Sequence, residues 1–165
     1  MSDELIDQLL PSAVSNPRAR INYNIHSDYT EAVQRFLNVI AYASYVRPHH
    51  HNQENAWEGI IILRGELSVF QFDNEGSILE RKELSENGPV LGIELDATAP
   101  HCIAALSEFA VIFEYKQGPY TIENDKTFQQ WAPAEQDEQA SLFNQWLKTA
   151  GEGEKYQPGP GAGFG

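Results

Sequence analysis

The chain has 165 residues, enough for one domain to bury a substantial core without disulfides or other cross-links. Its 24 acidic and 11 basic residues give a formal charge of −13, and this negative field repels nucleic acid and anionic membranes. We therefore expect no nucleic acid and no membrane as partners.

Three features of the sequence indicate a location inside the cell. Cys102 is the only cysteine, so no internal disulfide can form, as is usual in a reducing compartment. The first ten residues are acidic and amphipathic rather than basic and then apolar, which is not the pattern of a signal peptide. No apolar run is long enough to span a bilayer. We expect a cytoplasmic protein.

The N-terminal part predicts a short helix and then a strand. Residues 3–10 have apolar side chains at helical spacing, and Pro11, and then Asn16-Pro17, are expected to close off this helix. Residues 18–26 alternate in the manner of a strand, with one apolar face and one polar face that carries Arg20, Asn22, Asn24 and His26. An entirely polar face indicates either a solvated edge or the lining of a site.

The middle of the chain predicts many short strands separated by turn residues. Residues 34–46 form a long apolar and aromatic stretch that we interpret as two strands bent near Ala43, and Gly65 is expected in a tight turn. Further strands are predicted over residues 57–63, 66–73, 77–84, 90–95, 101–106 and 110–116. This spacing is typical of an antiparallel barrel or a double-sheet jelly roll, so the predicted fold is all-β with minor helices.

The C-terminal part changes character. Residues 125–133 are predicted to form an aromatic-bearing surface segment, followed over 135–150 by a helix whose apolar face carries Leu142, Phe143, Trp146 and Leu147. We expect three parts: a barrel with its N-terminal helix and strand over 1–120, a C-terminal segment and helix packed on it over 121–150, and a disordered Gly/Pro-rich tail over 151–165.

Three of the five histidines are consecutive, at positions 49 to 51. Because side chains alternate along a strand, His49 and His51 point to one face and His50 to the other. Glu58 opens the next apolar run, and His101 begins a strand whose same-face neighbours suit a barrel interior. The alternative is a polar loop and an ordinary core histidine. A buried cluster of this kind is costly without an ion, so we favour one divalent transition metal: Zn, Mn, Fe, Co or Ni.

Other side chains are candidates for the same cavity. Arg47 shares the parity of the metal-binding histidines, so it is expected to point inward, where its guanidinium can hold a carboxylate or phosphate. Glu114 and Lys116 interrupt an apolar strand, and they either line the site or form a surface ion pair. Cys102 should point away from the histidine before it and act as a small buried hydrophobe.

The histidine pair, a Glu and a Gly separated by six residues, and a distant His together resemble the cupin signature. Longer segments resemble the WbuC family of cupin-fold metalloproteins, namely residues 16–26, 32–38, 44–51 and 113–120. The resemblance covers roughly residues 12–135. It implies a cupin barrel, which is a double-stranded β-helix of jelly-roll type, with a metal held by His49, His51, Glu58 and His101.

The resemblance also implies an association with gene clusters for O-antigen and surface-polysaccharide synthesis. We therefore expect a metal-dependent enzyme of the isomerase or epimerase type that acts on a sugar or sugar nucleotide. Such a reaction needs a base, for which the candidates are His26, Glu114 and Tyr23. The expected substrate-binding residues are Arg47, Arg18, Arg20, Asn22 and Asn24.

Two other classes of function stay open at this point. An Fe(II)-dependent dioxygenase would use the same ligand types, and a non-catalytic module would bind a metal and a sugar without turnover. By resemblance to other cupins we also expect a homodimer, with residues 128–131 as a candidate interface.

Overall fold

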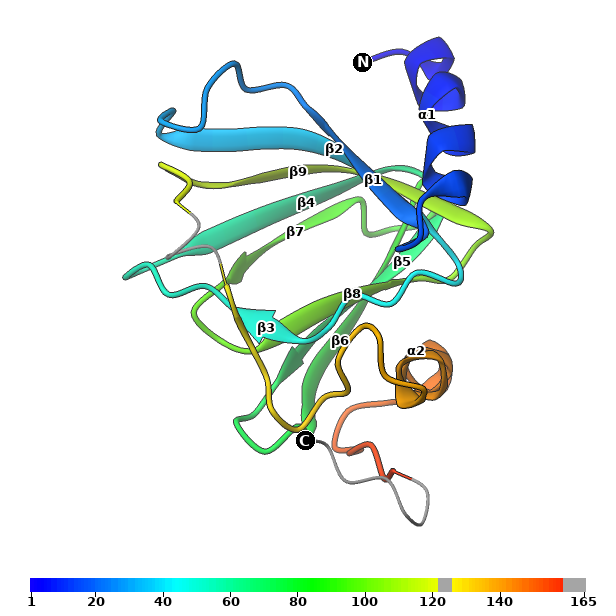
Figure 1. The fold of residues 1–165 in the computed structure, drawn as a ribbon, viewed down its shortest axis with the longest axis vertical. Helices are drawn as coiled ribbons and strands as arrows, with labels where there is room; N and C mark the ends of the chain where they lie inside the picture. The colour runs from blue at the N-terminus through cyan, green and yellow to red at the C-terminus, as the bar shows by residue number, and fades with distance from the viewer. Residues whose placement is uncertain (122–125, 159–165) are drawn as a thin grey trace.

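Two antiparallel five-stranded sheets face each other in the computed structural model, which describes residues 1–121 and 126–158 (Figure 1). The first sheet contains, in spatial order, β1 (Arg20–Asn24), β2 (Val33–Ala41), β9 (Phe109–Gln117), β4 (Trp57–Arg64) and β7 (Gly92–Asp96). The second contains β10 (Thr127–Phe128), β3 (His49–His50), β8 (His101–Ala105), β5 (Glu66–Phe72) and β6 (Ile78–Ser85). This is the predicted jelly-roll barrel of the cupin type, which confirms the expected fold class.

Strand alternation divides the core into layers. Leu67 and Val69 of β5 pack between the two sheets, whereas Phe70 of the same strand lies in a separate cluster under the C-terminal helix. The same alternation places Ile103 of β8 between the sheets and Cys102 in the cluster outside them. Both cysteine predictions, burial and an orientation opposite to His101, are therefore confirmed.

The N-terminal helix α1 (Asp3–Ser15) lies against the outside of β1 and β2 (Figure 1). It continues through Pro11, so the prediction that this proline ends it is wrong. Proline removes one helical hydrogen bond. The buried side chains Ile6 and Ala13, one on each side of the proline, pack in one cluster with Val39 and so anchor both halves of the helix.

The apolar stretch predicted as two strands contains only one. β2 ends at Ala41, and residues 42–48 have no regular secondary structure. The backbone N–H of Ser44 donates to the carbonyl of Ala41 at 2.9 Å, which turns the chain away from the sheet. Side chains beyond this turn no longer follow strand parity. Tyr45, for example, is buried under α2 and donates from its hydroxyl to the carbonyl of Pro133.

The C-terminal helix α2 (Gln139–Thr149) packs on the outer face of the second sheet. Phe143 and Leu147 are fully buried there, but Leu142 is 47% exposed, so its predicted place on the buried face is wrong. A helix turns about 100° per residue, so Leu142 lies about 100° from Phe143 and about 140° from Leu147, at the edge of the contact face. Within the described residues, neither helix is long and apolar enough to cross a membrane.

Residues 151–158 are ordered against the barrel, contrary to the prediction of a disordered tail. The backbone N–H of Ile78 donates to Glu154 and that of Gly153 donates to Ile78, at 2.9 and 2.8 Å. The ring centroid of Tyr156 lies 4.9 Å from that of Phe143. Aromatic burial therefore offsets the entropy of ordering this Gly-rich stretch. The rest of the predicted tail, 159–165, and the start of the predicted surface segment lie outside the described residues.

Replacing Phe143 with alanine should test how much α2 contributes to the fold. Because the ring is fully buried, we expect Phe143→Ala to lower the free energy of unfolding by about 3–5 kcal/mol. Leu142→Ala, on the neighbouring and largely exposed position, should cost less than about 1 kcal/mol. Urea denaturation followed by circular dichroism measures both values. Equal losses in the two variants would contradict this packing.

Candidate metal centre and cavity

Three buried histidines converge between the two sheets. His49 of β3 and His101 of β8 are directly opposite each other in the strand register, and His51 follows β3. One ring nitrogen from each histidine lies within 4.8 Å of the other two. Nitrogen ligands lie about 2.0–2.1 Å from a bound transition metal, so a small closing of the side chains suffices to place one ion between all three.

The histidine rings are oriented by backbone carbonyls. Nδ1 of His49 lies 2.9 Å from the carbonyl oxygen of Arg47, and Nδ1 of His101 lies 2.8 Å from that of Ala99. A carbonyl can only accept, so each Nδ1 carries the ring proton and each Nε2 offers a lone pair. Nε2 of His101 is buried and has no hydrogen-bond partner among the described residues. Burial lowers the pKa of both rings, which keeps them in the neutral form that binds metals.

Glu58 of β4 brings a buried carboxylate beside this cluster. Its Oε2 lies 3.2 Å from Nε2 of His51 and 3.8 Å from Nε2 of His101. Burial opposes ionisation, but the hydrogen bond from His51 and the electrostatic interactions with His101 and Lys116 lower the pKa of Glu58 well below its usual range. Three imidazoles and one ionised carboxylate are donors that fit a divalent transition metal.

His50 points away from the cluster, as strand alternation predicts. Its Nδ1 lies 2.7 Å from the amide nitrogen of the Gln129 side chain, on the other face of β3. It therefore serves as an internal comparison for the metal-site histidines.

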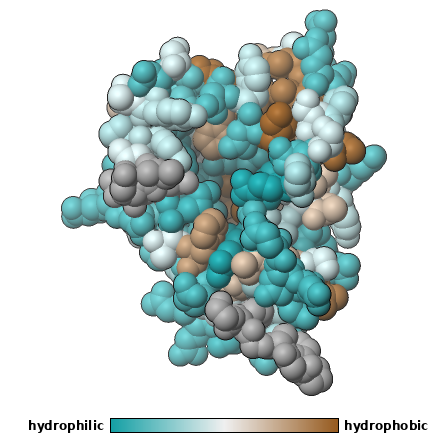
Figure 2. All heavy atoms as spheres, in the orientation of Figure 1, coloured by the Kyte–Doolittle hydropathy of each residue, from teal (hydrophilic) through white to brown (hydrophobic). Residues whose placement is uncertain are grey.

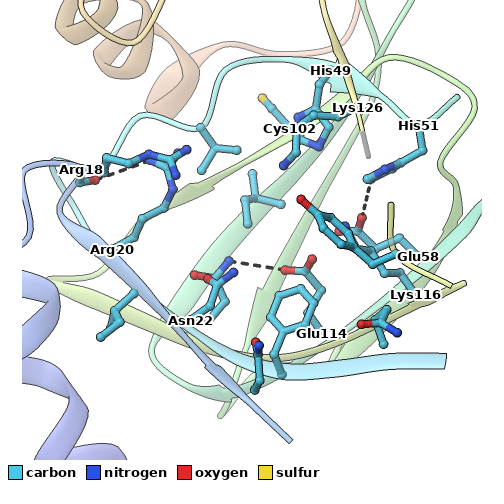
Figure 3. A pocket seen from close by; sticks show the side chains of 18 of the residues that line it. Arg18, Arg20, Asn22, His49, His51, Glu58, Cys102, Glu114, Lys116 and Lys126 are labelled. Atoms are coloured by element: carbon cyan, nitrogen blue, oxygen red, sulfur yellow. Dashed lines mark hydrogen bonds and ion pairs between the residues drawn. The ribbon is translucent and has the colours of Figure 1, made fainter. Parts of the chain in front are cut away.

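A cavity of about 650 Å³ joins the histidines to the inner face of the first sheet. In Figure 3, Arg18 and Arg20 lie at one end of it and His49, His51 and Glu58 at the other. Figure 2 shows mainly hydrophilic side chains around the hollow on this face of the molecule. The polar face of the strand at 18–26 lines this cavity through Arg18, Arg20, Asn22, Asn24 and His26. Of the two interpretations left open by the sequence, the structure supports the lining of a site.

The arginine end of the cavity is organised by one carboxylate. Arg18 donates to both oxygens of Glu135 at 2.8 Å, and Arg20 donates to Oε1 of the same carboxylate. Arg20 is only 9% exposed, and it also donates to the carbonyl of Tyr45 at 2.8 Å. Two guanidinium groups share one carboxylate, so this end keeps a net positive charge.

Glu114 of β9 is buried and lines the cavity, so of the two alternatives that the sequence left open the structure supports the lining of the site. It is 7% exposed, and its Oε2 lies 3.4 Å from the side-chain nitrogen of Asn38. Burial and the nearby Glu58 carboxylate raise the pKa of Glu114 to about 8. At neutral pH this side chain is therefore largely a carboxylic acid.

Two predicted site residues lie elsewhere. The Arg47 guanidinium donates to the carbonyl of Gln129 at 2.9 Å and lies 5.4 Å from the ring centroid of Phe128, and Arg47 is not among the residues that line the cavity. The parity argument failed because Arg47 lies in the irregular segment 42–48. Tyr23 is 44% exposed on the face of β1 opposite to Asn22, so it does not reach the cavity either.

Sequence reasoning missed one wall of the cavity. Gln34, Phe36 and Asn38 of β2 line it together, at alternate positions of one strand. Tyr29 and Tyr120 were also missed, since they belong to loops. The signal available in the sequence was the pair of polar residues Gln34 and Asn38, which stand at alternate strand positions on either side of Phe36 and so indicate a partly polar face.

A family model described as a domain of unknown function, DUF6016, matches residues 1–84. The chain belongs to this family. The matched part of this DUF6016 protein includes His49, His51 and Glu58 but ends before β8. No curated protein matches the chain. The narrower WbuC resemblance stays a prediction.

Solved structures resemble this DUF6016 protein in fold. A protein from Shewanella oneidensis has a TM-score of 0.59 at 8% identity, covering 76% of this chain and 84% of the other. Oxalate oxidase in complex with glycolate has a TM-score of 0.54 at 14% identity, with 70% and 57% covered. The capsular polysaccharide assembling protein CapF from Staphylococcus aureus has a TM-score of 0.54 at 15% identity, with 68% and 30% covered. The chain thus spans little more than half of the oxalate oxidase chain and under a third of CapF, and these likenesses show the fold alone.

Removing one histidine should separate metal binding from folding. We expect His101→Ala to weaken Zn²⁺ binding roughly tenfold to a hundredfold or more, because this substitution removes one of the nitrogen donors of the cluster. His50→Ala should leave affinity unchanged, since this ring points to the other face of β3. Titration of the metal-free protein with Zn²⁺ against a chromophoric chelator measures both. Full affinity in His101→Ala would refute the site.

The raised pKa of Glu114 should make the metal-free protein less stable as pH rises. Between about pH 4.5, where the unfolded side chain ionises, and about pH 8, the folded state holds a proton that the unfolded state has released. The free energy of unfolding should then fall by up to about 1.4 kcal/mol per pH unit from this group.

Glu114→Gln should lack this part of the pH dependence, whereas Glu108→Gln, at an exposed position, should keep it. Urea denaturation at a series of pH values, with a chelator present, measures the difference between each variant and the unmodified protein. Parallel pH profiles for the unmodified protein and Glu114→Gln would show that Glu114 ionises normally in the fold.

Proposed function

We propose that this chain is a metal-dependent enzyme that acts on a sugar or sugar nucleotide, as an isomerase or epimerase. One observation carries the proposal: a single cavity holds the histidine cluster, the buried acid Glu114 and a wall of amide and guanidinium groups. The link to surface-polysaccharide synthesis rests on the WbuC resemblance.

The proposed ligands of one divalent ion are His49, His51, Glu58 and His101. The short distances from Glu58 to two of the histidines and the unpartnered Nε2 of His101 support this set. When bound, such an ion polarises a substrate carbonyl and so makes the neighbouring C–H more acidic.

Proton transfer is assigned to Glu114. It lies in the cavity wall two positions along β9 from Lys116, and Asn38 holds its carboxyl group. A carboxyl group whose pKa is about 8 can both release and accept a proton near neutral pH, as an isomerase or epimerase requires. His26 stays a weaker candidate because its Nδ1 is already engaged by the backbone of Arg35.

The remaining wall supplies substrate contacts. Asn22 and Asn24 offer both donors and acceptors, which suits hydroxyl groups. Arg18, Arg20 and Lys116 supply positive charge to the cavity of a protein whose formal charge is −13, and this contrast favours a substrate with an anionic group.

A second candidate function is an Fe(II)-dependent dioxygenase. The specific observation in its favour is the donor set itself, since three imidazoles and a carboxylate also suit Fe(II). Hydrogen exchange and oxygen uptake, measured as described below, distinguish the isomerase or epimerase from the dioxygenase.

The test is hydrogen exchange. Metal-loaded protein is incubated in D₂O with a panel of sugars and nucleotide sugars, and mass spectrometry follows deuterium that enters the carbon skeleton. We expect exchange with at least one compound, and a loss of roughly a hundredfold or more in rate for Glu114→Gln. Glu108→Gln is the matched control and should exchange at the normal rate.

Other outcomes overturn the proposal. Oxygen uptake by Fe(II)-loaded protein without exchange would favour the dioxygenase. Tight sugar binding with neither exchange nor oxygen uptake would favour a non-catalytic binding module.

A further inference from the structure

His26 presents an unsatisfied donor to the cavity. It is 8% exposed, and its Nδ1 lies 3.0 Å from the backbone nitrogen of Arg35 and 2.9 Å from the carbonyl oxygen of that residue. That oxygen already accepts from the backbone N–H groups of Ile25 and His26, at 2.8 and 3.1 Å, which uses both of its lone pairs. Nδ1 therefore accepts from the Arg35 N–H, and the ring proton lies on Nε2. Among residues 1–121 and 126–158, Nε2 is buried without a hydrogen-bond partner.

Gln34 presents an unsatisfied acceptor to the same cavity. It is 2% exposed, and its side-chain nitrogen donates to the carbonyls of Tyr29 and Glu31 at 3.2 and 3.0 Å. These two bonds fix the orientation of the amide and leave Oε1 buried, with no hydrogen-bond partner in the part of the chain that the structure describes. Buried polar atoms are nearly always paired, so an acceptor and a donor left open in one cavity indicate a ligand that offers both.

Aromatic rings flank these two groups. The ring centroid of Tyr29 lies 5.4 Å from that of His26 and 5.2 Å from that of Tyr120. The ammonium group of Lys116 lies 6.0 Å from the Tyr120 centroid. All of these residues line the cavity, and together they offer a surface on which a planar ring can stack.

The strand register places this aromatic end at a fixed distance from the candidate metal centre. Gln34 of β2 is opposite Lys116 of β9, and Lys116 is opposite Glu58 of β4. Two strand spacings separate the backbone of Gln34 from that of Glu58, which is about 10 Å. Lys116 lies between them. Across the three strands the order is thus the polar aromatic pocket at Gln34, the cation of Lys116 and the metal-site carboxylate of Glu58.

We propose that His26, Tyr29, Gln34 and Tyr120 form a distal subsite that binds the base of a nucleotide-linked substrate. A pyrimidine base such as uracil presents carbonyl and N–H groups side by side, which match the Nε2–H of His26 and the Oε1 of Gln34. Its diphosphate then lies over Lys116, and the attached sugar reaches the metal site. This inference rests on the proposed function and narrows its substrate from a sugar or sugar nucleotide to the latter.

The test uses UDP and inorganic pyrophosphate as probes for the full-length protein, free of metal. We expect UDP to bind at least roughly tenfold more tightly than pyrophosphate in isothermal titration calorimetry, because only UDP carries a base. Tyr29→Leu should weaken UDP binding roughly tenfold and leave pyrophosphate binding unchanged. His26→Phe, which keeps a ring but removes the donor, should also weaken UDP binding selectively.

Two controls accompany these variants. Tyr29→Phe keeps the stacking ring and should retain UDP affinity, and Tyr42→Leu removes an exposed tyrosine that does not line the cavity. Tyr29 is itself 54% exposed, so its replacement should not impair folding.

The two proposals fail in different ways. Equal affinity for UDP and pyrophosphate, or full UDP affinity in Tyr29→Leu, would overturn the distal subsite, while exchange into a simple sugar would still uphold the proposed function. Selective UDP binding by a protein that binds no metal would support the distal subsite and overturn the proposed function.

Discussion

The cost of burying imidazole rings around one point governs the rest of this structure. His49 and His101 come from neighbouring strands of the second sheet, and each ring is held by the carbonyl two residues earlier in the chain. This repeated arrangement turns two lone pairs toward the same small volume. Within the described residues, Nε2 of His101 has no hydrogen-bond partner in that volume, and an unpaired polar atom is costly in a protein interior. Glu58 adds the negative charge that a cation would balance.

The interior of the barrel divides into an apolar half and a polar half. Ile60 and Ile62 follow Glu58 on the inner face of β4, and Ile112 precedes Glu114 on the same face of β9. One half packs as an ordinary core and supports the sheets. The other half gives up that packing for buried acids, amides and histidines, so it contributes chemistry at the expense of stability.

The sequence correctly predicted the features that depend on local geometry, namely the direction of side chains along single strands and the position of a tight turn. Alternation along single strands correctly separated His49 from His50, and placed Cys102 away from the barrel interior. The glycine expected in a tight turn, Gly65, has a φ of +81°, and an added Cβ would lie 2.1 Å from the carbonyl oxygen of Phe109. These features depend on residues that are close in sequence, so they can be read without a structure.

Features that depend on distant pairing could not be predicted in the same way. Nothing local to Arg18 indicates that Glu135 lies beside it. The alternation of Gln34 and Asn38 marks a polar face, but the place of that face in the cavity depends on the register of β2 with β9. Arg47 was misplaced for a related reason, because strand parity was extended into a segment that is not a strand. The order of residues 151–158 likewise depends on contacts with Ile78, more than seventy positions away.

Gln129 couples the C-terminal segment to the strand that carries the histidines. Its backbone N–H donates to Pro48 and its carbonyl accepts from Arg47, each at 2.9 Å, while its side chain contacts His50. β3 is only two residues long, and these contacts of Gln129 hold it on the face away from the cavity. Thermodynamic linkage then runs in both directions. An ion held by the three imidazoles would therefore also stabilise the segment around Gln129, and unfolding of that segment would weaken the binding of the ion to the same extent.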